Sequence, residues 1–91
     1  MRQIYDYIFG HSWLMKELNL KENEEYLVVE EVGELRKGDV VRLVGFSDID
    51  NHYGIFVFYD SQGQILEVSG DYAGPDHSST NRMRTALTKV N

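Results

Sequence analysis

The chain has 91 residues, a formal net charge of −6, a hydrophobic fraction of 42% and no cysteine. A chain of this length corresponds to one domain, 1–91, and this composition excludes a disordered protein. The lack of cysteine excludes disulfides, thiolate zinc sites and a cysteine nucleophile. No stretch approaches the roughly 18 apolar residues of a membrane span, and the first seven residues lack the apolar run of a signal peptide. We therefore expect a cytoplasmic location.

The first twenty residues are expected to form a helical cap. Ile4 and Ile8 are spaced to share one helical face, and Ser12 is a suitable N-cap for a second short piece at 13–18. An isolated helix this short does not persist in water. The segment is therefore predicted to dock its apolar side chains on a sheet.

Residues 24–69 are predicted to form antiparallel strands. Apolar, β-branched and aromatic runs are separated by turns rich in glycine and acidic residues; the runs are 26–29, 40–46, 53–59 and 64–68. The run at 53–59 is almost unbroken, which predicts a central strand buried on both faces. The predicted core residues are Tyr26, Val28, Val41, Leu43, Ile55, Val57, Leu66 and Val68.

The last part of the chain, 70–91, is predicted to be a long loop followed by a terminal strand or a short helix. Residues 70–80 are rich in Gly, Asp and Ser, which is typical of a loop. At 83–90 the pattern suits an edge strand and a helix equally, and we favour the strand because the sheet otherwise has an uncovered edge.

Four or five short strands in meander order predict a mainly β (α+β) fold, either a small barrel or a curved antiparallel sheet with an N-terminal helical segment. Lys37-Gly38-Asp39 precedes a strand that ends in Gly45-Phe46, and Tyr53-Gly54 opens the next. This arrangement resembles SH3-like small β-barrel domains of uncharacterised bacterial proteins. The resemblance covers 25–69 and implies a fold, with no particular reaction.

One motif bears on catalysis. Gly38-Asp39, followed by His52 at the head of a strand, resembles the cysteine peptidase and acyltransferase superfamily that includes lecithin:retinol acyltransferase-like proteins. In that superfamily, a histidine at this position activates a cysteine, and this chain has none. A serine nucleophile would need an elbow motif of the Gly-x-Ser-x-Gly type, which is also absent. We therefore expect that the protein is not an enzyme.

The loop from Ser47 to His52 carries alternate oxygen ligands of the kind that hold a hard cation. A calcium loop counted from Asp48 needs Gly at its sixth position and Glu at its twelfth, and the chain has Tyr53 and Tyr59 there. We therefore expect no metal and no cofactor.

Aromatic side chains between 53 and 72 could stack nucleic-acid bases. A binding site of this kind also needs Lys or Arg along the phosphate backbone of the nucleic acid. The segment 43–81 contains neither. Nucleic acid and membranes are therefore not expected as partners.

The same segment, 43–81, carries six acidic residues, whereas nine acids balance nine bases in the rest of the chain. A segment that carries only negative charges attracts basic partners or cations. The alternative is that its aspartates serve to form turns and to keep the protein in solution. We predict a small acidic protein-binding module, of the immunity or inhibitor type, that neutralises a basic partner such as a nuclease toxin. The predicted partner-binding residues are Asp48, Asp50, Asp60, Asp71 and Asp76, with Tyr53 and Tyr72 as aromatic anchors. The alternatives are a non-catalytic accessory or regulatory domain, and a small-ligand domain with a pocket near His52 and Asp39.

Overall fold

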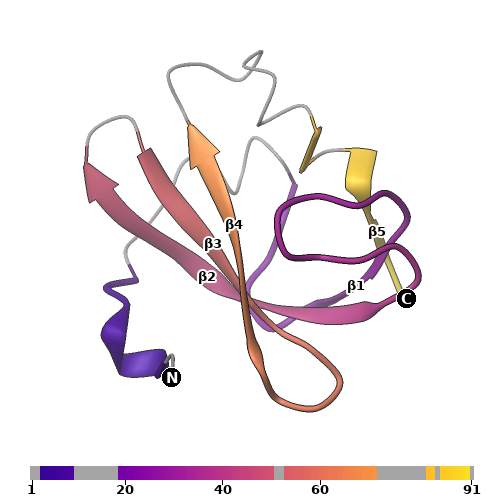
Figure 1. Ribbon diagram of the computed structural model, residues 1–91, viewed down its shortest axis with the longest axis horizontal. Helices are drawn as coiled ribbons and strands as arrows, with labels where there is room; N and C mark the ends of the chain where they lie inside the picture. Colours follow the sequence, from indigo (N-terminus) through magenta and orange to yellow (C-terminus); the bar gives the residue numbers. More distant parts are fainter. Residues whose placement is uncertain (1–2, 10–18, 51–52, 72–81, 84, 91) are drawn as a thin grey trace.

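The computed structural model describes residues 3–9, 19–50, 53–71, 82–83 and 85–90 (Figure 1). These residues form a 3-10 turn and five strands: η1 (Ile4–Asp6), β1 (Glu25–Val28), β2 (Val40–Asp50), β3 (Tyr53–Tyr59), β4 (Ile65–Asp71) and β5 (Leu87–Lys89). The strands make one antiparallel sheet in the order β4-β3-β2-β1-β5. The prediction of a mainly β fold is confirmed.

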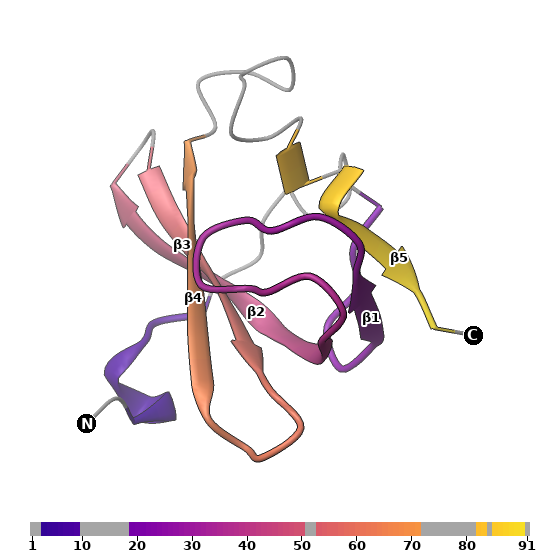
Figure 2. The same cartoon turned by 45° about the vertical axis from the view of Figure 1, so that its right-hand side comes forward.

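The long strand β2 connects the two halves of the sheet. Its first residues pair with β1, as in Tyr26 opposite Val41, and the rest of the strand pairs with β3. Arg42 faces both neighbours, Glu25 on β1 and Tyr59 on β3. The register shifts just after Arg42, between Leu43 and Gly45, and a bulge of this kind bends a strand and increases its twist. Figures 1 and 2 show β3 and β4 beside one end of β2, with β1 and β5 at the other.

The inner face of the sheet carries the hydrophobic core. Six of the predicted core residues are buried: Tyr26, Val28, Val41, Leu43, Val57 and Val68. Ile55 and Leu66 are only partly buried. The largest buried side chains are three phenylalanines, and the rings of Phe46 and Phe56 lie 4.7 Å apart. Because side chains alternate along β3, Phe56 and Phe58 point into this core, whereas Ile55 and Val57 point to the outer face.

The outer face is covered at Val57 by the N-terminal segment. Phe9 lies over Gly45, the β2 residue opposite Val57, and a Cβ added to Gly45 would be 2.9 Å from the Phe9 ring. The Ile8 amide donates to the Ser47 hydroxyl at 3.3 Å, and Phe9 forms a bridge with Ser47. As a result Val57 is completely buried, so the prediction that 53–59 is buried on both faces is confirmed at this position.

Of the predicted helical cap at 1–20, residues 1–2 and 10–18 lie outside the described residues, and 3–9 contain the 3-10 turn η1. The predicted helical face shared by Ile4 and Ile8 is not formed, because Tyr7 is extended and Phe9 lies in a β-bridge. At the other end of the chain, the two predicted alternatives, a short helix and a strand, both occur, one after the other. Arg82, Met83, Thr85 and Ala86 are helical, and the strand β5 follows directly. In the part of the chain that the structure describes, no helix is long and apolar enough to cross a membrane.

Replacing Val57 with alanine is expected to lower the free energy of unfolding by about 2–4 kcal/mol, because it leaves a cavity beneath the N-terminal segment. Val29→Ala is the matched control, because the Val29 side chain is 40% exposed, and it should change stability by about 0.5 kcal/mol or less. Urea denaturation measures the loss of stability in both variants, provided that the slope of unfolding free energy against urea concentration is unchanged. Equal losses in the two variants would contradict this account of the outer face.

Candidate functional site

The loop between β1 and β2, residues 29–39, forms one wall of the candidate site. Val32 and Leu35 anchor it in the core, with exposed fractions of 6% and 0%. Their main chains also bond to each other, since the Leu35 amide donates to the Val32 carbonyl at 2.9 Å and the reverse bond is 3.2 Å. Gly33 has a φ of +54° in this tight turn, a left-handed conformation that glycine adopts without strain. The loop is thus a fixed element with two buried anchors.

Glu34 fastens the tip of this loop to the edge strand β4. Its amide donates to the Glu67 carbonyl at 3.2 Å, and the Glu67 amide donates to the Glu34 carboxylate at 2.8 Å. The loop passes so close that a Cβ on Gly33 would lie 3.0 Å from the Val68 Cα. Figure 2 shows the loop reaching from β1 across to β4.

Between this loop and the β3–β4 turn lies a hollow of about 920 Å³. Its charged lining residues are Glu31, Glu34, Arg36, Asp39 and Asp60. Four acidic residues and one arginine therefore line this hollow, which we call the acidic groove. Clefts lined by charge of one sign focus the electrostatic field and raise the local concentration of the opposite charge.

Asp60 is held in place by the turn that it starts. Its Oδ1 accepts hydrogen bonds from the amides of Gln62 and Gln64, both at 2.8 Å. The main chain adds a bond from the Asp60 amide to the Gln64 carbonyl at 2.9 Å. This is the Asx-turn chemistry for which aspartate is preferred. Asp60 thus has a structural role in the hairpin and also contributes charge to the acidic groove.

The residues predicted to bind a partner fall at opposite ends of the sheet. Asp50, Tyr53 and Asp71 form a row across β2, β3 and β4, because Asp50 is opposite Tyr53 and Tyr53 is opposite Asp71. Asp48 lies one step along, opposite Gly54. Asp60 is at the other end of β3, roughly 20 Å away at 3.3 Å per residue.

Three further residues singled out in the sequence, Tyr72, Asp76 and His52, lie outside the described residues. The alternative of a small-ligand pocket near His52 and Asp39 therefore stays a prediction, and Asp39 itself lines the acidic groove.

Sequence reasoning missed Glu31 and Glu34. Both lie in the part of the chain where acids and bases balance, and Arg36 and Lys37 follow within a few residues. The contact between Glu34 and Glu67 places the loop beside β4, so that its acidic residues line the same hollow as Asp60.

The groove lacks the ligand set of a metal centre: among the residues that the structure describes, no group of three or more His, Cys, Asp or Glu side chains could hold a metal ion.

Comparisons with protein-family models, with curated proteins and with solved structures find no match for this chain.

Removing the Glu34 carboxylate should break one of the two hydrogen bonds between the loop and β4. We expect Glu34→Ala to speed hydrogen exchange at the Glu67 amide and to cost about 1 kcal/mol of stability, the usual net value of one hydrogen bond. Glu34→Gln keeps an oxygen acceptor and should preserve slow exchange. Amide exchange followed by NMR distinguishes the two variants. Equally fast exchange in Glu34→Gln would show that the acceptor oxygen is not what protects this amide.

Proposed function

We propose that this protein is a small acidic protein-binding module whose partner is basic, comparable to immunity-type inhibitors that neutralise nuclease toxins. The observation that carries the proposal is the acidic groove, where Glu31, Glu34, Asp39 and Asp60 meet one arginine. Two of these carboxylates are positioned by main-chain amides, Glu34 by Glu67 and Asp60 by its own turn. A positioned carboxylate loses little conformational freedom when it binds, which favours affinity.

We also propose that the sheet is a small SH3-like barrel and that the 3-10 turn η1 belongs to an N-terminal helical segment. The strand order β4-β3-β2-β1-β5 supports the barrel, as does the bulge in β2. The bonds between Glu34 and Glu67 add to this support, because they bring the β1–β2 loop to the edge of β4. In such a barrel the acidic groove would lie on the rim, between one loop and one hairpin turn.

In this proposal the protein acts by binding, with no catalysis. The acidic groove would steer a basic partner during diffusional encounter, and association would slow as salt shortens the Debye length to roughly 8 Å at physiological ionic strength. The absence of cysteine from the whole chain supports a binding role over the acyl-transfer chemistry of the superfamily that its Gly38-Asp39 and His52 pattern resembles.

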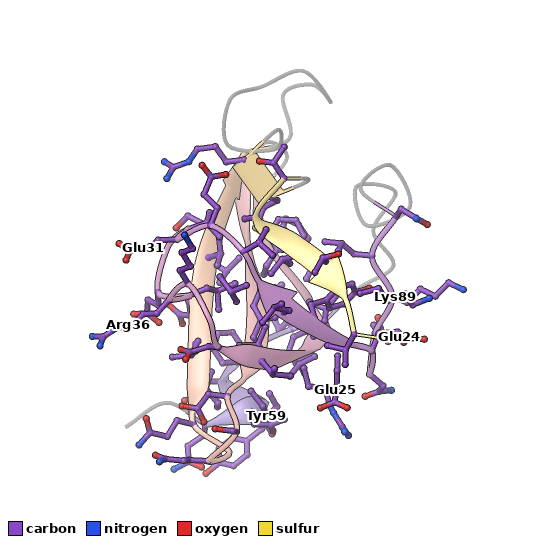
Figure 3. All side chains as sticks on the ribbon, turned by 90° about the vertical axis from the view of Figure 1, so that its right-hand side faces the viewer. Glu24, Glu25, Glu31, Arg36, Tyr59 and Lys89 are labelled. Carbon is purple, nitrogen blue, oxygen red and sulfur yellow. The ribbon has the colours of Figure 1, made fainter. Side chains whose placement is uncertain are left out.

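The test compares two variants that remove the same charge at different places. Glu31→Gln with Asp39→Asn changes the acidic groove, and Glu22→Gln with Glu24→Gln is the control. Figure 3 shows Glu31 on one side of the molecule and Glu24 on the other. With an octalysine peptide as the probe, stopped-flow fluorescence should show association several-fold slower, with a weaker salt dependence, for the groove variant alone.

A third variant, Asp48→Asn with Asp50→Asn, tests the other end of the sheet in the same assay. We expect a smaller effect than for the groove variant. If the control slows association as much as the groove variant does, only the net charge matters and the proposal is wrong. Thermal unfolding of each variant confirms that the fold is intact.

A further inference from the structure

A second hollow lies on the outer face of the sheet, beside the same hairpin turn. Its volume is about 620 Å³, and it is lined by Glu25, Val40, Arg42, Tyr59, Asp60, Ser61 and Gly63. Asp60 lines both this hollow and the acidic groove. A partner in the groove can therefore reach the outer hollow by passing over a single residue.

The outer hollow combines an aromatic ring, an aliphatic surface and a fixed carboxylate. Tyr59 is half-buried on β3, and Val40 on β2 is 39% exposed. Asp60 follows Tyr59 directly, and its Oδ1 is held by two main-chain amides. Figure 3 places Tyr59 and Glu25 at the same end of the molecule.

The chain's own cation in this hollow has an acidic neighbour. Arg42 lies between Glu25 and Tyr59 in the strand register, so the Glu25 carboxylate is directly opposite it. Side chains directly opposite each other on antiparallel strands interact, and opposite charges there attract. The lining of the outer hollow therefore carries two acidic residues, Glu25 and Asp60, against one arginine, and its net charge is negative.

We propose that this outer hollow is an arginine subsite for the basic partner, an inference that rests on the proposed function. The methylene stem of a partner arginine would lie on Val40, and its guanidinium would stack on the Tyr59 ring and pair with the Asp60 carboxylate at Oδ2. Guanidinium is planar, weakly hydrated and able to stack on aromatic rings, whereas ammonium is a compact, strongly hydrated charge. The subsite therefore selects arginine over lysine.

Octa-arginine and octalysine peptides of equal formal charge test the inference. Titration calorimetry at one fixed ionic strength should give the arginine peptide a dissociation constant roughly three- to tenfold lower, the size expected of a cation–π contact. Tyr59→Leu and Asp60→Asn should each bring the ratio of the two constants close to one. Tyr59→Phe keeps the ring and should keep the preference. Asp60→Asn keeps an Oδ1 acceptor for Gln62 and Gln64, so it removes charge without removing the turn.

A second readout does not depend on any variant. The ring protons of Tyr59 should shift in NMR spectra when octa-arginine is added, and should shift much less with octalysine. Equal affinities for the two peptides, or an arginine preference that persists in Tyr59→Leu, would overturn the subsite and leave the proposed function standing. If neither peptide binds, both the subsite and the proposed function are wrong.

Discussion

The contact between Glu34 and Glu67 is the constraint on which the rest of the molecule depends. Two hydrogen bonds at this point tie the β1–β2 loop to the edge of β4, although the two residues are 33 positions apart in the chain. The loop brings Val32 and Leu35 into the core, and its Glu31 and Asp39 line the hollow that Asp60 of the hairpin turn also lines. The same loop therefore contributes two side chains to the core and one wall to the acidic groove.

Glu67 also connects this contact to the opposite face of the sheet. Its carboxylate accepts a hydrogen bond from the Tyr7 hydroxyl, while its main chain is bonded to Glu34. The N-terminal segment, the edge strand and the loop thus meet at one residue. Val57 is opposite Glu67 on β3 and lies under the same segment. Such shared contacts explain how a chain of this length can bury Val57 on the outer face of β3, even though small domains bury a limited fraction of their surface.

The sequence was sufficient for features that are local. The apolar run at 53–59 predicted β3, and the polar, glycine-containing stretches 36–39 and 60–63 predicted the turns at Gly38 and Gly63, both of which have positive φ. An unbroken apolar run has no alternation, however, so it could not show that Phe56 rather than Ile55 faces the core. The acidic groove was hidden for a different reason: Glu31 and Asp60 are far apart in sequence, and Glu31 lies outside the segment 43–81 that lacks basic residues. A row such as Asp50, Tyr53 and Asp71 likewise follows only from the register of three strands.

At position 60, folding and the proposed binding place different demands on the side chain. The hairpin needs an oxygen that accepts the amides of Gln62 and Gln64, and asparagine supplies one as well as aspartate does. Recognition of a cation needs the negative charge, which only aspartate supplies. Evolution can therefore exchange the two residues freely where the turn is all that matters. In any relative of this chain, the choice between Asp and Asn at this position records whether selection has acted on the hairpin alone or on an encounter with a basic partner as well.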